Sequence, residues 1–183
     1  MRKLIYSINL SIDACCDHTK MTGDDSIMEF FGDLLRESDL LVYGRTTYEL
    51  MVPYWPDIAK KPMEDPVEYE FAQAFDALDK IVFSKTIKEV GERTRIVRTN
   101  LKEEILKLKQ EHGGHILTGG IALSSKLVEL GLVDEYYFVV QPVIVGGGRR
   151  LFEGIHLSEN IKLKLVEAKP LKTGHVMLHY VNP

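Results

Sequence analysis

The chain has 183 residues, of which 45% are hydrophobic and 27% are charged, and these proportions are typical of one compact domain over residues 1–183 rather than of a disordered or fibrous protein. The formal net charge of -4 leaves no chain-wide basic field that would hold nucleic acid or an anionic membrane. No apolar run reaches the roughly 20 residues of a membrane-spanning helix, so we expect a cytoplasmic protein with no membrane partner.

The N-terminal part of the chain is predicted to hold a strand, a long loop and a helix. Alternating residues over positions 4–10 predict a strand near the centre of a sheet. Residues 11–25 lose this periodicity and gather acidic side chains, which indicates a long loop of the kind that often carries function. Apolar residues at helical spacing predict a helix over residues 26–37, with Ser26 and Glu29 as its capping box.

A second strand and a second helix follow without a long connection. Residues 40–43 form a short apolar run, and Gly44 and Arg45 come directly after it. Thr46 and Glu49 repeat the capping-box pattern at the start of the next helix. The sequence therefore predicts a strand-to-helix turn that carries a basic residue.

The middle of the chain alternates between helices and strands after an interruption by prolines, the last of which is Pro62. Asp65 and Asn100 are placed as helix N-caps, and Gly131 lies where a left-handed residue would end a helix. The predicted elements are helices starting at residue 66, spanning about residues 101–111 and starting after residue 120, with strands over residues 80–84, 95–97 and 115–118.

The C-terminal part changes to strands joined by loops. Residues 136–145, 161–168 and 176–180 predict three strands with no helix between them, which implies antiparallel pairing at one side of a mixed sheet. His175 and His179 share one side of the last strand by parity, where surface or packing roles are expected.

Three turns at predicted strand ends are candidate anion sites. They are Gly44-Arg45-Thr46-Thr47, Ser84-Lys85-Thr86 and Thr118-Gly119-Gly120-Ile121-Ala122. Glycines and helix N-termini bring backbone N–H groups close to phosphate, and the basic side chains add charge. Each turn also has a purely structural explanation: a tight turn with a surface arginine, a solvated turn, or close helix–strand packing. Since parallel strands end on one edge, we expect the three turns to converge on an extended polyanion such as a phosphorylated dinucleotide.

Other motifs of catalysis and metal binding are absent from the sequence. There is no G-x-G-x-x-G fingerprint, no P-loop and no Gly-x-Ser-x-Gly nucleophile elbow. The six histidines have no metal-ligand spacing, and the adjacent Cys15 and Cys16 are too few for a zinc site. No metal is therefore expected.

Two sets of residues resemble known families. Residues 41–49 resemble the MGRxTxE segment of dihydrofolate reductases. Residues 116–120, 127–135, 141–148 and 151–152 resemble the C-terminal reductase domain of bacterial bifunctional riboflavin-biosynthesis proteins. The resemblance implies a three-layer α/β/α dihydrofolate-reductase-like fold, with a mostly parallel mixed sheet and antiparallel C-terminal strands. It also implies NADPH as cofactor and a small heterocyclic or ribosylaminopyrimidine-type substrate.

The same resemblance implies the cofactor contacts. The residues implied to lie near the adenosine phosphates are Gly44, Arg45, Thr46 and Thr47. Those implied to lie near the 2′-phosphate are Ser84 and Lys85. Those implied to surround the pyrophosphate are Thr118, Gly119, Gly120, Ile121, Ala122 and Leu123.

Two carboxylates are implied as catalytic residues. Asp13 lies in a segment that matches the family's SxDG, with Ala14 in place of the glycine. Glu29 lies near the position of the acid of folate reductases, although its place in the predicted capping box explains it without catalysis.

Several functions stay open on this basis. The absence of a clear acid favours an NADPH-dependent reductase, of the 5-amino-6-(5-phosphoribosylamino)uracil type or with another substrate, over dihydrofolate reduction. A non-catalytic nucleotide-binding module and a plain oligomerising α/β domain are the alternatives to a reductase. The apolar strands at residues 136–140 and 176–180, or the segment at residues 142–148, are expected to form a homodimer contact, and the resemblance also points to a homodimer.

Overall fold

The computed structural model describes residues 1–61 and 65–183, so the predicted break at Pro62 lies outside the described residues. The strands are β1 (Leu4–Ser11), β2 (Ser38–Gly44), β3 (Asp79–Phe83), β4 (Thr94–Val97), β5 (His115–Thr118), β6 (Glu135–Gln141), β7 (Lys164–Pro170) and β8 (Val176–Val181). The helices are α1 (Asp25–Arg36), α2 (Arg45–Met51), α3 (Trp55–Ala59), α4 (Pro66–Ala77), α5 (Leu101–Gln110) and α6 (Ala122–Glu129), with a 3₁₀ turn at His18–Lys20. None of the helices in these ranges is long and apolar enough to cross a membrane.

The strands of the described residues form one sheet in the order β4-β3-β2-β5-β1-β6-β8-β7. Strands β1 to β6 run parallel to one another, while β8 is antiparallel to β6 and β7 is antiparallel to β8. This arrangement confirms the predicted α/β fold with a mostly parallel mixed sheet and antiparallel strands at one side.

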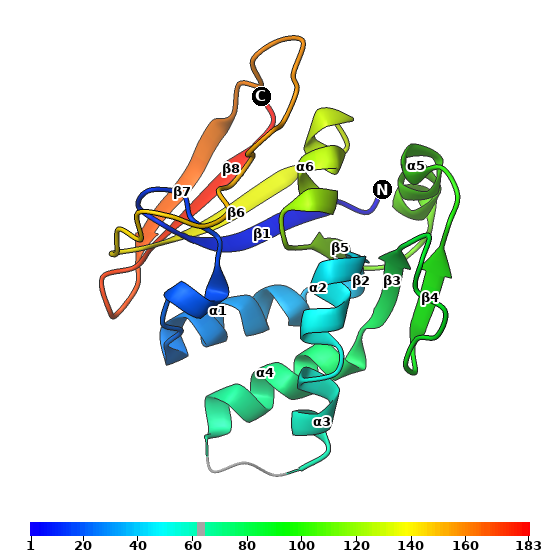
Figure 1. The fold of residues 1–183 in the computed structure, drawn as a ribbon, viewed down its shortest axis with the longest axis horizontal. Coiled ribbons are helices and arrows are strands. Elements are labelled where there is room, and N and C mark those ends of the chain that lie inside the picture. Colours follow the sequence, from blue (N-terminus) through cyan, green and yellow to red (C-terminus); the bar gives the residue numbers. More distant parts are fainter. Residues whose placement is uncertain (62–64) are drawn as a thin grey trace.

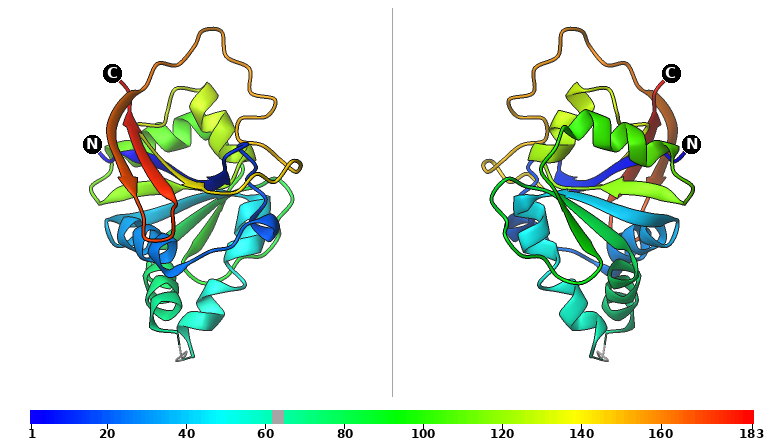
Figure 2. Two further views of the ribbon diagram at one scale, coloured as in Figure 1. Left: turned by 90° about the vertical axis from the view of Figure 1, so that its left-hand side faces the viewer. Right: turned by 90° about the vertical axis from the view of Figure 1, so that its right-hand side faces the viewer.

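Helices cover both faces of the sheet, which gives three layers (Figure 1). On one face, Ile105 of α5 and Leu127 of α6 are fully buried in the same apolar cluster as the β1 residue Leu4. On the other face, Leu34 of α1 and Phe75 of α4 pack in a second cluster. The two side views show the same division, with the β7–β8 hairpin at one end of the sheet (Figure 2). The two faces of β1 enter different clusters, which explains its nearly continuous burial.

Three of the predicted helix ends are confirmed. The Asp65 side chain accepts hydrogen bonds from Val67 N and Glu68 N at the start of α4, and the Asn100 side chain accepts one from Lys102 N at the start of α5. Gly131 follows α6 with a φ of 64°, the left-handed conformation in which glycine avoids a side-chain clash.

Both predicted capping boxes are wrong. Helix α1 is capped by Asp24, whose side chain accepts from Ile27 N, and the Ser26 hydroxyl donates to Asp24 Oδ1 at 2.6 Å. The ionised carboxylate two residues earlier is the stronger acceptor and takes the cap position from Ser26. Helix α2 begins at Arg45 directly after β2, so Thr46 lies within the first turn and Gly44 is a cap without a side-chain hydrogen bond.

Two predicted strands have different ends. Strand β6 ends at Gln141 instead of residue 145, because Pro142 has no N–H for the sheet ladder. Strand β7 covers Lys164–Pro170 instead of residues 161–168. Its register is set by pairing with β8, in which Pro170 lies opposite Val176.

Candidate functional site

The three predicted turns emerge on one edge of the sheet. β2 pairs in parallel with β3, with Gly44 opposite Phe83, and with β5, with Val42 opposite Thr118. We call this the carboxyl edge, because the parallel strands β1, β2, β3, β5 and β6 all end there. In parallel α/β sheets this edge is where ligands bind.

Arg45 joins the turn after β2 to the turn after β3. Its Nη1 donates to Thr86 Oγ1 at 2.8 Å, and its Nε donates to Glu49 Oε1 at 2.8 Å. The side chain is exposed, and the structure gives Nη2 no hydrogen-bond partner among the described residues. The guanidinium is thus held in place with donor capacity left for an anion.

Ser84 and Lys85 differ in what they offer a ligand. Ser84 is buried, and its Oγ accepts from Thr86 N at 3.2 Å and Ile87 N at 3.1 Å, so its hydroxyl shapes the turn. Lys85 is exposed, and no ion pair is found for it within residues 1–61 and 65–183. Of the two, Lys85 is the side chain able to meet a phosphate.

Gly120 allows the turns after β2 and β5 to interlock. Its φ is 77°, and a Cβ built there would lie 2.0 Å from Thr47 Oγ1. At Gly44, in the turn after β2, a Cβ would lie 3.3 Å from the Cβ of Leu123. The turns after β2 and β5 are therefore also closely packed at this second position. Any side chain at position 120 would therefore displace Thr47 from its place at the start of α2.

Thr118 supports the glycine turn from within. It is fully buried, and its Oγ1 donates to Val42 O at 2.7 Å. The Ser124 hydroxyl donates to Gly119 O, and the Tyr6 hydroxyl donates to Gly120 O at 2.8 Å. These bonds fix the two glycines and keep Thr118 itself away from a ligand.

The start of α6 presents backbone donors at this edge. Ile121 precedes the helix without a side-chain cap, Ala122 is exposed and Leu123 is half-buried. The first N–H groups of a helix have no intrahelical partner, and they lie at the positive end of the helix dipole. Phosphate oxygens are the natural acceptors for such a group of donors.

Asp13 joins β1 to the segment after β6. Its Oδ1 accepts from Ser11 Oγ at 2.6 Å and from Val145 N at 3.0 Å, and its Oδ2 accepts from Gly146 N at 2.9 Å. The hydrogen bond from Ser11 and the two backbone N–H groups hold the pKa of Asp13 well below its ordinary value. Asp13 is therefore an anionic anchor at neutral pH, and a catalytic role for it stays a prediction.

The loop at residues 11–17 and the segment at residues 142–151 are joined along their length. Ile12 N donates to Val143 O, Cys16 N donates to Arg149 O, and the amide of residue 151 donates to Ala14 O, each at 2.9 Å. Ala14 has a φ of 62°, the left-handed conformation for which glycine is the usual residue. The match to SxDG fails at this one residue, and the backbone there keeps a glycine-like conformation.

Glu29 lies on the exposed side of α1. Its Oε2 is 3.6 Å from the Nζ of Lys172, and it lines a hollow between α1 and α4. No contact between Glu29 and the three turns is found among the described residues. The structure thus separates Glu29 from the basic turns, and its catalytic role also stays a prediction.

The sequence analysis assigned no functional role to two buried polar residues of this edge: it expected a surface or packing role for His175 and did not single out Gln141. His175 precedes β8 and is buried, with its Nδ1 at 3.0 Å from Asp24 Oδ2. Gln141 ends β6 and is also buried, and its Nε2 has no hydrogen-bond partner among the described residues. Sequence spacing gives no signal for a contact between residues 24 and 175.

A hollow of about 560 Å³ lies at the opposite edge of the sheet. Its cations are largely engaged: Arg2 pairs with Asp39, and Arg95 pairs with Glu104 at 2.6 Å. The volume alone therefore gives no argument for a ligand at that edge.

Comparisons with known proteins agree with this architecture. The model of the RibD C-terminal domain family matches residues 2–177. "Uncharacterized protein YyaP" of Bacillus subtilis is similar at 32% identity, over 98% of this chain and 94% of its own length. "Uncharacterized protein YwjB" of the same organism is 26% identical over 98% of each chain.

Solved structures share the fold at lower identity. A putative riboflavin biosynthesis protein from Shewanella sp. PV-4 has a TM-score of 0.75 and 18% identity, and the match covers 99% of both chains. A pyrimidine reductase-like protein from Corynebacterium diphtheriae has a TM-score of 0.69 and 15% identity over 98% of this chain and 91% of its own. A diaminohydroxyphosphoribosylaminopyrimidine deaminase/5-amino-6-(5-phosphoribosylamino)uracil reductase from Thermotoga maritima reaches 0.67 and 15%, and the match covers all of this chain and 57% of that one.

Proposed function

We propose that this chain, which belongs to the RibD C-terminal domain family, is an NADPH-dependent reductase acting on a ribosylaminopyrimidine-type small molecule in a riboflavin pathway. The fold supports the class, because proteins named as riboflavin biosynthesis and pyrimidine reductase proteins share it. The observation that carries the proposal is the interlocked pair of turns at Gly120 and Thr47, with Arg45 and Lys85 beside it.

The residues of the carboxyl edge fit a phosphorylated dinucleotide. A Cβ at Gly120 would fill the space beside Thr47, and the N–H groups of α6 are available there. Arg45 and Lys85 would hold the adenosine-side phosphates, and the start of α6 would hold the pyrophosphate. The chemistry that NADPH supplies when bound is hydride donation to an electrophilic carbon. The protein would orient the acceptor and exclude water.

The proposed acceptor is 5-amino-6-(5-phosphoribosylamino)uracil or a close analogue, the compound in the name of the Thermotoga maritima protein. Dihydrofolate is the comparison substrate. A non-catalytic nucleotide-binding module is the second candidate function, favoured by the two predicted carboxylates: Asp13 is held by backbone N–H groups and Glu29 is exposed beside Lys172.

Cofactor binding tests the first step of the proposal. Titration of the protein with NADPH and with NADH, followed by nicotinamide fluorescence, should show tighter binding of NADPH. Arg45→Ala should weaken NADPH binding about tenfold or more, because it removes a charge-assisted hydrogen bond to phosphate. Lys85→Ala should weaken binding of NADPH but not of NADH if Lys85 meets the 2′-phosphate.

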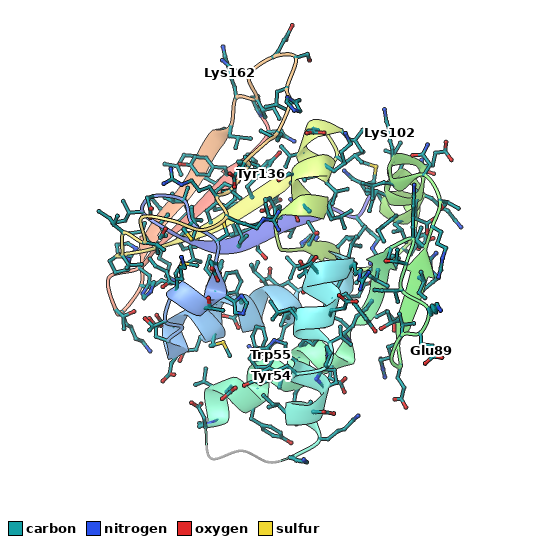
Figure 3. All side chains as sticks on the ribbon, in the orientation of Figure 1. Tyr54, Trp55, Glu89, Lys102, Tyr136 and Lys162 are labelled. Atoms are coloured by element: carbon teal, nitrogen blue, oxygen red, sulfur yellow. The ribbon has the colours of Figure 1, made fainter. Side chains whose placement is uncertain are left out.

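Lys102→Ala is the matched control for both variants. Lys102 is an exposed lysine on α5 and points away from the body of the protein (Figure 3). Equal weakening by Lys102→Ala and Arg45→Ala would contradict a phosphate site at the three turns. NADPH oxidation that depends on the uracil acceptor would support the reductase, while binding without oxidation of NADPH by either acceptor would favour the module.

The exposed end of the sheet supports a homodimer as part of the proposal. All seven residues of β7 are exposed, with Leu165 at 50% and Val166 at 54%, and β7 is an edge strand. Pairing of a second chain with this edge would cover the exposed Leu165 and Val166 side chains and use the unpaired backbone groups of the edge strand. Light scattering should report a dimer, and Val166→Lys should shift it towards monomer. A monomeric wild-type protein would contradict this part of the proposal.

A further inference from the structure

His175 lies at the carboxyl edge, in the hairpin between β7 and β8. Its carbonyl accepts from Leu171 N at 2.8 Å, which closes the hairpin, and β8 begins at the next residue. Its side chain is 7% exposed, and the ring meets the start of α1, where Nδ1 lies 3.0 Å from Asp24 Oδ2. A buried imidazole beside a carboxylate is an arrangement able to move a proton.

Asp24 and Thr173 determine which ring nitrogen carries the proton. The Thr173 hydroxyl donates to Asp24 Oδ2, which leaves its oxygen to accept from His175 Nδ1 at 2.6 Å. Burial raises the pKa of Asp24, but hydrogen bonds from Ser26, Thr173 and Ile27 N and the charge of His175 outweigh this effect and lower it. An ionised Asp24 also accepts from Nδ1–H, so Nε2 is left without a partner among the described residues.

Gln141 lies beside His175 with an unpaired amide. Val140 and Val176 are opposite each other on β6 and β8, so the next residues outward on the two strands are Gln141 and His175. Two residues inward on each strand, residues 139 and 177 pack against Ile27 of α1. By alternation Gln141 and His175 face the same layer, nearer the edge. A buried amide with no partner is costly unless a ligand pairs with it.

The geometry points to His175 as the proton donor of the proposed reduction, with Asp24 as its positioning residue and the Gln141 amide as a hydrogen-bonding group for the acceptor's heterocycle. This inference rests on the proposed function. The two carboxylates predicted from the sequence are poor candidates for the proton donor, because Asp13 is held in its anionic form and Glu29 is exposed beside Lys172.

The proton balance holds for reduction of a C=N bond, which the ribosylamine acceptor presents in its open-chain imine form, after the ring oxygen has left the sugar carbon as a hydroxyl. The acceptor carbon gains a C–H bond with the hydride of NADPH, and the π electrons of C=N move to nitrogen. That nitrogen forms an N–H bond with the proton from Nε2 of the His175 imidazolium. NADPH is oxidised to NADP⁺, and His175 becomes neutral and takes its next proton from solvent.

The charged groups on the elements packed against the hairpin bear on any pH dependence of His175. They are the N-cap Asp24 with Asp25 and Glu29 of α1, Lys172 in the hairpin, and Asp13 with Arg150 at the neighbouring loop. Asp24 is the member of this set that contacts the imidazole.

The first test is the tautomer of His175, which needs neither cofactor nor acceptor. In ¹⁵N-labelled full-length protein at alkaline pH, the imidazole spectrum should show a protonated Nδ1 and an unprotonated Nε2. The signal is assigned by its loss in His175→Gln. A protonated Nε2 in the neutral ring would overturn the inference, because that nitrogen would then be unable to take up the proton it must donate.

The second test separates proton donation from binding. With 5-amino-6-(5-phosphoribosylamino)uracil or dihydrofolate as acceptor, His175→Gln should lower kcat about 100-fold or more. NADPH affinity should stay within twofold. We expect the wild-type kcat to fall towards alkaline pH, and this fall should be absent in His175→Gln. Asp24→Asn keeps a good N-cap residue and should lower kcat at least tenfold while disturbing the Nδ1–H tautomer. The exposed His156, changed to Gln, is the matched control and should leave kcat unchanged.

The outcomes distinguish this inference from the function on which it rests. If the wild type oxidises NADPH with either acceptor and His175→Gln keeps its kcat and pH profile, His175 is not the proton donor and the reductase proposal stands. If the wild type binds no NADPH and reduces neither acceptor, the proposed function fails, and the assignment of His175 to this reaction fails with it.

Discussion

Polar groups are used differently in the two halves of the carboxyl edge. The turns after β2 and β5 interlock through Gly120, and Arg45 joins them to the turn after β3 through Thr86. The exposed Lys85 has no ion pair within the described residues. At the ends of β1 and β6, the carboxylates are taken up by the protein itself, Asp13 by backbone N–H groups and Asp24 by α1 and His175. The first half presents donors to an anion, whereas the second half uses its anions to hold loops and one imidazole in place.

Gly120→Ala should have the largest effect on this comparison. An alanine at position 120 would have to adopt a positive φ, which costs about 1–2 kcal/mol of stability. Its Cβ would also overlap the Thr47 side chain, which adds about 1–3 kcal/mol. We expect a loss of about 3 kcal/mol in the free energy of unfolding, measured in urea, together with loss of NADPH binding. The overlap is specific to Thr47, so adding Thr47→Ala should restore part of the stability.

Gly131→Ala separates the two contributions. Gly131 has a φ of 64° and no atom within 4 Å of the place where a Cβ would lie. Its alanine variant therefore has the cost of a positive φ but no steric overlap with another residue. It should lose about 1 kcal/mol and keep cofactor binding. Equal losses at positions 120 and 131 would show that the turns do not interlock through Thr47.

Asp13→Asn should have the next largest effect, in the other half of the edge. An amide cannot accept from both Val145 N and Gly146 N, since its NH₂ group would face one of these donors. Because the folded-state pKa of Asp13 lies below the ordinary value of about 3.9, its contribution to stability is present above that pH and is lost as pH falls towards the folded pKa. The urea midpoint of the variant should lie below that of the wild type at pH 7, and the gap should narrow between about pH 4 and pH 2.

Asp33→Asn is the control for this experiment. Asp33 is an exposed carboxylate paired with Arg36 at 2.8 Å on the same helix, a type of pair that contributes little to stability. The difference in urea midpoint between the wild type and Asp13→Asn should depend on pH. If it does not, the charge of Asp13 does not hold residues 145 and 146.

The two halves also differ in how far the sequence predicts them. Parallel strands with turns at their ends are a local pattern, so the gathering of Arg45, Lys85 and the glycine turn on one edge follows from the α/β alternation. The Asp24–His175 contact joins residues far apart in the chain, and no local spacing encodes it. The same contact explains why the predicted capping box at Ser26 is wrong. That prediction used only the residues next to Ser26 in the sequence, whereas Asp24 is held as the N-cap by Ile27 N of α1 and by Thr173 of the hairpin.

Ala14→Gly should have the smallest effect and the opposite sign. Ala14 has a φ of 62° in the loop that Asp13 anchors, and a non-glycine residue in this conformation costs about 1–2 kcal/mol. Glycine removes this cost but adds about 0.5–1 kcal/mol of entropy in the unfolded chain. The net result should be a gain of about 0.5 kcal/mol in the free energy of unfolding. Ala77→Gly at the end of α4, where the backbone is helical, should instead lose stability. If Ala14→Gly also loses stability, the loop does not hold residue 14 in the left-handed conformation, and the hydrogen bonds that join residues 11–17 to residues 142–151 would need a different backbone path.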